Sequence, residues 1–435
     1  MKEEKESWLL SQDNFAKFFF YLLILFLPTQ FGRHFWPQFS FIQGLRLDYL
    51  SPTIYLTDIF IILIIIFSFE KIINFFKKQN KKNIFLFLLF FLSLFIGVFN
   101  SKNPQAGVYG MIKIIEYLFL GIYIGISFAN INKKHFVFIL IFGIIFESAL
   151  SFLQLFNNGS LNGVFYFLGE RYFTSQTPGI ANASINGQLF LRPYATFPHP
   201  NVLAGYLVVA MVFISKFKKH TSSKLFFFTI LIGTASLFLT LSRVAILIWS
   251  VYLIFLFYIP LAEKYKKRNS NKNNTTAILT IFVLVILISA FFLKPPLMQR
   301  FIQTKFSEES FVQREYLIKQ SIGMFIKNPM FGVGINNFYN NLEKTKEKTL
   351  FIQPVHNIFL LVLSETGLVG VIYFLIIFYK SLKREVFKDW ENRDILLIPA
   401  LIVLGMFDHY FLTVQQGQIM ILLIFSQVFS ARIRK

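Results

Sequence analysis

The chain of 435 residues is 55% hydrophobic and only 15% charged, with a mean hydropathy of +0.58, which excludes an ordinary soluble protein. Its net charge of +21 raises nucleic acid as a partner, but the basic residues lie scattered between apolar segments and form no single basic face, so we expect no nucleic acid. The sequence has no cysteine, which excludes disulfides and thiolate metal sites.

Twelve apolar segments are candidates for membrane-spanning helices. A helix needs about 20 mostly apolar residues to cross a hydrocarbon core of ~30 Å, and several of these segments are shorter. We therefore predict an all-α, polytopic transmembrane helical bundle of about 12 helices. The expected spans are residues 15–31, 54–70, 84–99, 108–128, 135–156, 201–215, 225–241, 244–260, 277–293, 357–379, 395–411 and 414–430.

The distribution of lysine and arginine predicts the orientation of the bundle. More than half of the 43 basic residues lie in the two tails and in the connections expected on the same face. The positive-inside rule then makes both termini cytoplasmic, and we expect the first apolar run to be retained as a helix because no small-residue cleavage site follows it. The short connections of the outer face contain few basic residues, namely Arg33, Arg46, Lys102, Arg171, Arg192 and Arg243.

Three segments of the outer face are polar against this apolar background. Residues 157–200 are rich in Gly, Asn, Ser and Pro, and residues 407–418 form a polar turn between two spans. Residues 294–356 are the longest polar stretch, and their alternating charge predicts short surface helices around 311–327 and 339–348. We expect this stretch to be a large extracytoplasmic loop.

The first candidate site is the segment RPYATFPHPN, from Arg192 to Asn201, which leads into the sixth span. Its prolines favour an extended approach, and Asn201 is expected to be the N-cap of the helix. A helix N-terminus beside an arginine forms an anion site. The alternative is an ordinary entry loop, which is the preferred interpretation for His199 taken alone.

The second candidate is Leu241-Ser242-Arg243, a tight outer turn between two apolar spans. An arginine is costly in so short a turn unless its side chain snorkels to the interface or binds an anion. Snorkelling is usual for a lone arginine. Because Arg192 and Arg314 are expected on the same face, an anion site gains weight, although Arg314 could equally belong to a solvated helix face.

The third candidate is the end of the long loop, where His356 precedes the tenth span. A partly desolvated imidazole there could act as a base near neutral pH, and Asn357 could cap the helix or orient the histidine. Glu365 would lie inside the bilayer. A functional role and a structural hydrogen bond to a neighbouring helix are equally good interpretations of it. Asp408 offers hydrogen bonds suited to a sugar, or else satisfies the backbone of its own hairpin.

Other sequence signals exclude several kinds of site. The GVG at 332–334 lacks the third glycine and the preceding strand of a dinucleotide fingerprint, so we expect its glycines to form a tight turn that packs the loop on the bundle. The outer face has no acidic pair or His-x-x-x-His pair at metal-ligand spacing. We therefore expect no bound metal and no cofactor.

Four segments, taken together and in order, resemble the O-antigen ligase and polymerase family of bacterial membrane glycosyltransferases. They are RPYATFPHPNVLAGYL (192–207), TLSRVAIL (240–247), NPMFGVGINNF (328–338) and VHNIFLLVLSETGLVG (355–370). The resemblance implies a multi-pass enzyme of the bacterial inner membrane. It would transfer a glycan from a polyprenyl diphosphate carrier to an acceptor hydroxyl at the extracytoplasmic face, without metal.

The resemblance also implies roles for the candidate residues. Arginine forks suit a diphosphate leaving group, and a neutral histidine suits a weakly acidic acceptor hydroxyl. Arg192, Arg243 and Arg314 would then bind the diphosphate, and His356 would be the catalytic base. The supporting residues would be Asn201, Asn357, Glu365 and Asp408.

Two questions stay open at the level of sequence. The acceptor could be a glycan, a lipid or a protein, because the same motifs serve a ligase and a polymerase. The chain could also be a transporter of polysaccharide or lipid-linked glycan, since twelve helices with cytoplasmic ends are common there; the expected gathering of arginines and histidine at one surface favours an enzyme. We divide the chain into N-terminal transmembrane helices (1–156) and an O-antigen ligase-like membrane domain (157–430) that includes the outer loop 294–356.

Overall fold

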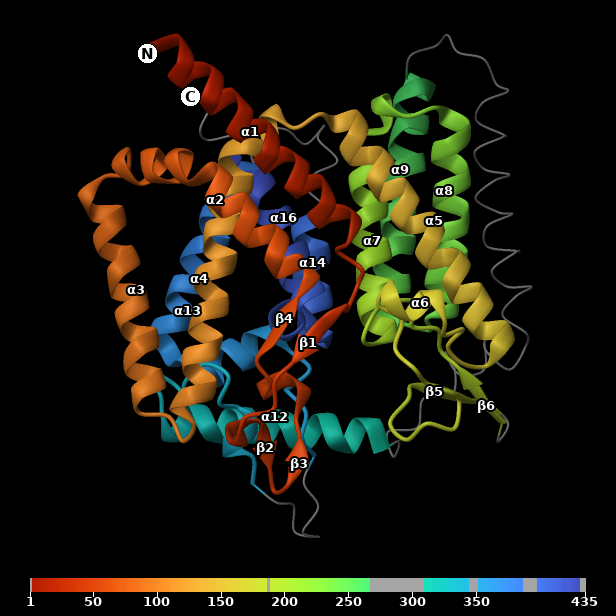
Figure 1. Ribbon diagram of the computed structural model, residues 1–435. Helices are drawn as coiled ribbons and strands as arrows, with labels where there is room; N and C mark the ends of the chain where they lie inside the picture. The colour runs from red at the N-terminus through yellow and green to blue at the C-terminus, as the bar shows by residue number, and fades with distance from the viewer. Residues whose placement is uncertain (1, 186–187, 267–308, 344–350, 386–396, 431–435) are drawn as a thin grey trace.

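The computed structural model describes residues 2–185, 188–266, 309–343, 351–385 and 397–430, and these are mostly helical (Figure 1). Eleven of the expected spans each coincide with a helix, while the expected span 277–293 lies outside the described residues. These helices are α1 (Lys2–Leu25), α2 (Leu56–Lys77), α3 (Lys81–Phe99), α4 (Pro104–Ser127), α5 (Lys133–Asn157), α7 (Pro200–Lys216), α8 (Ser223–Leu239), α9 (Arg243–Lys266), α13 (Ile358–Glu385), α14 (Leu397–Phe407) and α16 (Gln415–Ser430).

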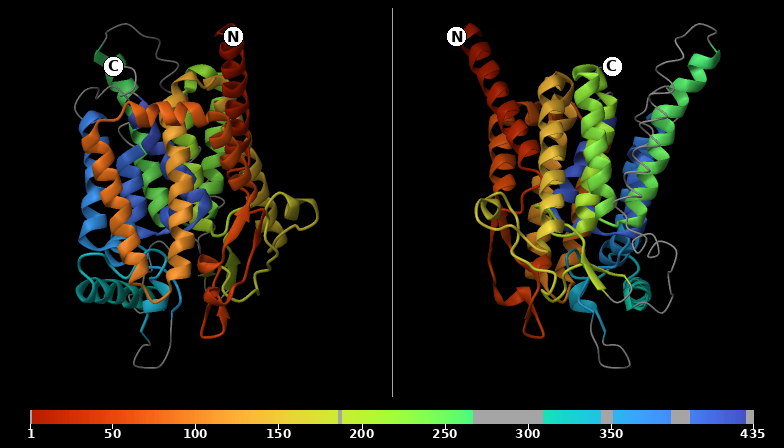
Figure 2. Two further views of the ribbon diagram at one scale, coloured as in Figure 1. Left: turned by 60° about the vertical axis from the view of Figure 1, so that its left-hand side comes forward. Right: turned by 90° about the vertical axis from the view of Figure 1, so that its right-hand side faces the viewer.

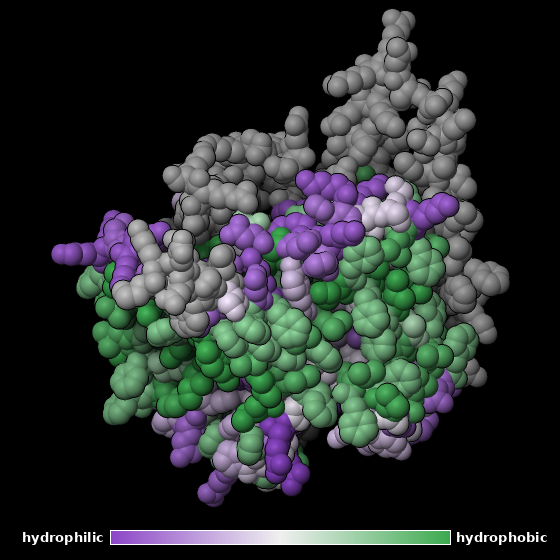
Figure 3. Space-filling view, turned by 45° about the horizontal axis from the view of Figure 1, so that its top comes forward, coloured by the Kyte–Doolittle hydropathy of each residue, from purple (hydrophilic) through white to green (hydrophobic). Residues whose placement is uncertain are grey.

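Five of the described helices are long and apolar enough to cross a membrane, namely α2, α3, α4, α5 and the first part of α13. Five more described helices are apolar but shorter, so the count of twelve crossings stays a prediction. The surface supports a membrane setting, because an apolar belt lies between two polar rims (Figure 3). On α2, for example, Ile59, Ile62 and Ile66 are about half exposed along one stripe, which suits lipid and not water.

Three further helices and five 3-10 turns complete the helical part of the described structure. The helices are α6 (Val164–Phe167), α12 (Glu309–Lys327) and α15 (Tyr410–Thr413). The turns are η1 (Gln38–Ser40), η2 (Asp48–Leu50), η3 (Phe128–Asn130), η4 (Lys218–His220) and η5 (Tyr339–Asn341). Three antiparallel pairs of strands were not predicted: β1 (Gly32–His34) with β4 (Thr53–Tyr55), β2 (Phe41–Ile42) with β3 (Leu45–Arg46), and β5 (Asn182–Ile185) with β6 (Gln188–Leu191). Strands of two to four residues are too short to show an alternating pattern.

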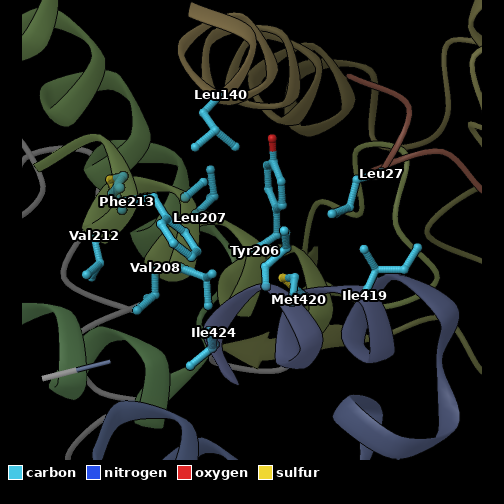
Figure 4. Packing of buried hydrophobic residues seen from close by; sticks show 14 of the residues in the cluster. Leu27, Leu140, Tyr206, Leu207, Val208, Val212, Phe213, Ile419, Met420 and Ile424 are labelled. Carbon is cyan, nitrogen blue, oxygen red and sulfur yellow. The ribbon is translucent and has the colours of Figure 1, made fainter. Parts of the chain in front are cut away.

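Helix α7 forms the centre of the bundle. Every residue from Val202 to Ser215 is buried, as expected of a helix that is apolar on all sides. Its Tyr206, Leu207 and Phe213 pack in one cluster with Leu140 of α5 and with Ile419, Met420 and Ile424 of α16 (Figure 4). The helix whose N-terminus carries candidate site residues is therefore held rigidly on all sides.

The polar segments expected on the outer face gather at one end of the bundle. The strand pairs, α6 and α12 lie at this end (Figures 1 and 2). The start of α1 and the connections α2–α3, α4–α5 and α7–α8 lie at the opposite end in both figures. The basic connections are thus separated from the polar segments by the length of the helices. Which end faces the cytoplasm stays a prediction from the charge distribution.

One surface helix of the long loop matches the sequence and the other does not. The helix expected at 311–327 is α12, which lies across the end of the bundle and packs Leu317 and Met324 toward α13 (Figure 1). Ser321 Oγ also donates to the Leu360 carbonyl of α13 at 2.9 Å. The prediction of a helix at 339–348 is wrong for the described part of that segment. Only the single 3-10 turn η5 forms there, and Glu343, which follows it, is not helical.

The segment 328–334 packs down on α13, which confirms the tight turn predicted for the GVG glycines. Gly332 and Gly334 have positive φ angles of 67° and 93°. The Gly334 N–H donates to the Glu365 carbonyl at 3.0 Å, and α13 is interrupted at Gly367, where φ is 63° and ψ is −165°. The Leu368 N–H, freed by this break, donates to the Pro329 carbonyl at 2.8 Å. Two of the motifs therefore form one structural unit.

Replacing Gly367 by alanine is expected to destabilise the protein strongly. A Cβ there would overlap the Met330 carbonyl, and the positive φ is itself unfavourable for alanine. We expect a loss of roughly 3 kcal/mol, seen as a lower melting temperature of the protein in detergent. The matched control is Gly323→Ala in α12, where a Cβ meets open space and the variant should be neutral or slightly stabilised. Equal melting temperatures for both variants would contradict the role of this break.

Candidate active site

A cavity of about 660 Å³ contains the candidate catalytic residue. Its polar part is lined by His199, His356, Asp408 and His409, which come from the N-terminus of α7, the start of α13 and the turn before α15. Its apolar part lies among the helices and is lined by Phe90, Leu94, Ile114, Leu118, Val362, Phe374, Ile421 and Leu422. The cavity therefore joins a polar end to an apolar interior.

His356 enters this cavity with a free nitrogen. Its Nδ1 is buried and has no hydrogen-bond partner among the described residues. Its ring lies edge to face against the ring of His409, with the centroids 5.0 Å apart. Burial lowers the pKa of His356 below 6.5 and the charge of Arg314 lowers it further, while Asp408 raises it. The imidazole is therefore neutral near pH 7 and able to accept a proton.

Asp408 is the carboxylate of the site. Its Oδ2 accepts a hydrogen bond from Asn201 Nδ2 at 2.8 Å, and its Oδ1 accepts one from the His409 backbone N–H at 2.8 Å. Burial opposes its charge, but His409, His356 and His199, together with the bond from Asn201, lower the pKa of Asp408 below its usual value. The carboxylate stays ionised and acts on all three imidazoles.

The other two histidines have structural partners. His199 is the N-cap of α7, and its Nδ1 accepts from the Asn201 backbone N–H at 3.1 Å. His409 Nδ1 lies 2.6 Å from the Thr413 hydroxyl oxygen. Burial lowers the pKa of each of these histidines to about 3. Both are therefore neutral, and of the three histidines only His356 has a buried Nδ1 without a hydrogen-bond partner among the described residues.

The prediction that Asn201 caps α7 is wrong, because His199 occupies that position and Asn201 lies inside the first turn. The proline at position 200 starts the helix one residue before Asn201. The Asn201 side chain instead connects two predicted site residues: its Oδ1 accepts from Arg192 Nη2 at 2.7 Å, and its amide donates to Asp408.

Two of the expected arginines lie beside one turn. Arg192 Nε donates to the Thr240 carbonyl at 2.7 Å, so its guanidinium adjoins the turn that precedes Arg243, the first residue of α9. Leu241 holds this turn at a φ of 53°. Arg314 of α12 is partly buried, and its charge lowers the pKa values of His356, His199 and His409. None of the three arginines is among the described residues that line the cavity.

Asn357 and Glu365 hold the start and the interior of α13 in place. Asn357 caps α13, since its Oδ1 accepts from the Phe359 and Leu360 backbone N–H groups at 2.9 and 3.0 Å, and its amide donates to the Met406 carbonyl at 3.1 Å. Glu365 lines the cavity, and its Oε1 accepts from the Phe338 backbone N–H at 3.2 Å. This bond supports the structural interpretation of Glu365.

Sequence reasoning missed the contribution of the N-terminal third of the chain, which it treated mainly as topology. His34, Asp48 and Tyr49 line the cavity near its polar end, and Lys113 lines it within the helices. Lys113 Nζ lies 2.7 Å from Asp58 Oδ2 in a buried ion pair. Only the fold brings these residues to the site, because no local motif marks them.

The described residues include no group of three or more His, Asp or Glu placed to hold a metal ion. The arrangement offers a neutral base, an ionised carboxylate and nearby arginines, which suits proton transfer next to an anionic leaving group.

The fold and the site together define a multi-pass membrane protein with a histidine–carboxylate site at one end of its helices. The model of the O-antigen ligase family matches residues 227–375, about a third of the chain. The chain thus resembles this family, as its motifs predicted, and the match indicates a membrane glycosyltransferase of the ligase or polymerase type. The matched segment includes Arg243, Arg314 and His356, whereas the segment 192–207 lies outside it. No curated protein matches the chain.

Proposed function

We propose that the protein transfers a glycan from a polyprenyl diphosphate carrier to an acceptor hydroxyl at the extracytoplasmic face of a bacterial inner membrane, with both of its termini in the cytoplasm. The observation that carries this proposal is the free, buried Nδ1 of His356 in a cavity that has a polar end and an apolar interior. The family match over residues 227–375 supports it.

The proposed reaction uses His356 as the general base. The acceptor hydroxyl gives its proton to His356 Nδ1 as its oxygen forms the new glycosidic bond, and the bond between the sugar and the diphosphate breaks. The electron pair of that bond leaves with the carrier diphosphate. Asp408, ionised close to the imidazole, stabilises the positive charge that His356 acquires.

The carrier binds through its two unlike parts. Its hydrocarbon tail occupies the apolar part of the cavity among α3, α4, α13 and α16. Its diphosphate lies toward Arg192, Arg243 and Arg314, whose guanidinium groups neutralise the charge that develops on the leaving group. The charge of Arg314 lowers the pKa of His356, which supports a position of Arg314 near the proposed base.

Replacing Arg243 by lysine is expected to lower kcat/KM for the lipid-linked donor by roughly tenfold or more. Lysine keeps the charge but loses the planar fork that binds two phosphate oxygens at once. The measurement is steady-state transfer by the purified protein at varied donor concentration. Lys219, which lies in η4 at the opposite end of the bundle, provides the control as Lys219→Arg. Full activity of Arg243→Lys would mean that Arg243 only snorkels to the interface.

One feature favours the alternative of a transporter. The break in α13 at Gly367 is a discontinuous helix, and such helices form the central binding sites of many transporters. Here, however, the freed backbone groups are bonded to residues 329–334 and are not open to a ligand. The break therefore docks the outer loop, and transfer is the better-supported function. The acceptor, whether a glycan, a lipid or a protein, is identified from the products formed when each is offered.

A further inference from the structure

The polar end of the cavity has an entrance cluster that takes no part in the proposed chemistry. It consists of Gln30, His34, Asp48, Tyr49 and Arg171, all of which line the cavity. Four of them come from the segment between α1 and α2, and Arg171 comes from the segment between α5 and α7. All five lie outside the segment matched by the family model.

An ion pair forms the outer part of the entrance cluster. Arg171 Nη2 lies 3.0 Å from Asp48 Oδ2, and each side chain is 51% exposed. Both charges act on His34: Asp48 raises its pKa and Arg171 lowers it, although burial is the largest influence and lowers it. The pair is thus open to solvent on one side and faces the cavity on the other.

Aromatic rings connect this ion pair to the candidate base. Tyr49 follows Asp48 directly, and its ring stacks on Tyr339 with the centroids 5.3 Å apart and the planes at 11°. The same ring lies edge to face against His409 at 5.8 Å, and His409 in turn contacts His356. A molecule bound at Asp48 and Arg171 would therefore extend along Tyr49 toward His356.

We propose that the entrance cluster binds the sugar of the acceptor, and that Asp48 and Arg171 select a neutral sugar. This inference rests on the proposed transfer function. A sugar ring presents hydroxyl groups that both donate and accept hydrogen bonds, together with apolar C–H faces. The Asp48 carboxylate accepts, the Arg171 guanidinium donates, and the Tyr49 ring supplies apolar surface. Because the two charges of the pair cancel, an acidic sugar gains little net attraction here.

The donor and the acceptor are then held on different sides of His356. The tail of the carrier requires the apolar part of the cavity among the helices, whereas the entrance cluster is mostly polar and its ion pair is half exposed. A hydroxyl that approaches from the entrance reaches His356 without crossing the apolar part. The entrance is therefore the side from which the acceptor arrives.

The test is the pair of variants Asp48→Asn and Arg171→Gln in the full-length protein, assayed with one lipid-diphosphate-linked glycan donor and an oligosaccharide acceptor with a neutral terminal sugar. We expect KM for the acceptor to rise by about tenfold in each variant, the loss typical of one hydrogen-bonding group in a site, while kcat and KM for the donor stay within about twofold. Arg171→Gln should also lose more activity toward uronic-acid acceptors than toward neutral ones. The reason is that Asp48, left without its partner, repels the acidic sugar.

Two controls separate binding from a structural link between the two segments. Glu343→Gln breaks the Lys327–Glu343 ion pair, which is similarly exposed and lies outside the cavity, and should leave KM for the acceptor unchanged. The double variant Asp48→Arg with Arg171→Asp should restore an ion pair, together with any melting temperature that the single variants lose. It should not restore KM for the acceptor, because the donor and acceptor groups have exchanged places.

The outcomes distinguish this proposal from the function on which it rests. If the wild-type protein transfers glycan but Asp48→Asn and Arg171→Gln keep the wild-type KM for the acceptor, the acceptor site is refuted and the transferase stands. Recovery of that KM in the charge-reversed double variant would show that the pair is only a structural link. If the wild-type protein transfers no glycan from any lipid-linked donor, the proposed function itself is refuted.

Discussion

His356→Ala is expected to lower kcat for glycan transfer by about 10²- to 10⁴-fold, the range that a positioned general base contributes. The variant removes a histidine whose buried Nδ1 has no hydrogen-bond partner among the described residues, whereas the Nδ1 atoms of His199 and His409 each have one. KM for the donor should change little, because the carrier is bound by its tail and its diphosphate. The measurement is the rate of product formation at saturating donor and acceptor.

Folding must be checked in the same experiment, because His356 is largely buried among polar groups. The melting temperature and the detergent-solubilised yield of His356→Ala should stay near those of the wild type. His220→Ala, in η4 at the opposite end of the bundle, is the matched control and should keep full activity. A folded His356→Ala that transfers glycan at nearly the wild-type rate would contradict the assignment of the base.

Arg314→Gln and Asp408→Asn are expected to shift the pH profile in opposite directions. In the wild type, kcat/KM should rise with pH as His356 loses its proton, and this acid limb should lie below pH 6.5 because burial lowers the pKa of His356. The Arg314 charge lowers that pKa further, so Arg314→Gln moves the limb to higher pH. Asp408 raises it, so Asp408→Asn moves the limb to lower pH.

Both variants should also lose activity. Arg314→Gln is expected to lower kcat/KM by about 10²-fold, the usual loss of one group that stabilises developing negative charge. Asp408→Asn removes the charge that stabilises protonated His356. Profiles of kcat/KM against pH for the two variants and the wild type check the shifts, with Lys319→Gln, an exposed position on the same helix as Arg314, as the control. Shifts of the same sign, or unshifted limbs, would show that His356 does not titrate in the acid limb.

The sequence predicted those parts of the fold that depend on one segment at a time. The apolar runs predicted the eleven described helices that coincide with expected spans, and the charge pattern of residues 311–327 predicted α12. The prediction failed where two strands of a few residues pair across a distance, as in β1 and β4. It failed also at Asn201, because the choice between His199 and Asn201 as cap depends on where Pro200 starts the helix.

The candidate site was predictable only in part for the same reason. His356 and Asn357 are marked by their place before a span, and Asn357 indeed caps α13. The role of Asn201 as a bridge between Arg192 and Asp408 needs three segments to meet, and no local pattern reports that. The ion pair of Asp48 and Arg171 joins residues 123 positions apart, so it too appears only in the fold.

Transfer itself is tested most directly with purified protein in liposomes that contain a polyprenyl-diphosphate-linked glycan of defined structure, with acceptor added outside. The measurement is the amount of glycosylated acceptor and of released polyprenyl diphosphate, followed together over time. We predict that the two products form in equal amounts with the wild-type protein and at least about 10²-fold more slowly with His356→Ala. Movement of the intact lipid-linked glycan across the bilayer, with neither product formed and no effect of His356→Ala, would contradict a transferase and indicate a transporter.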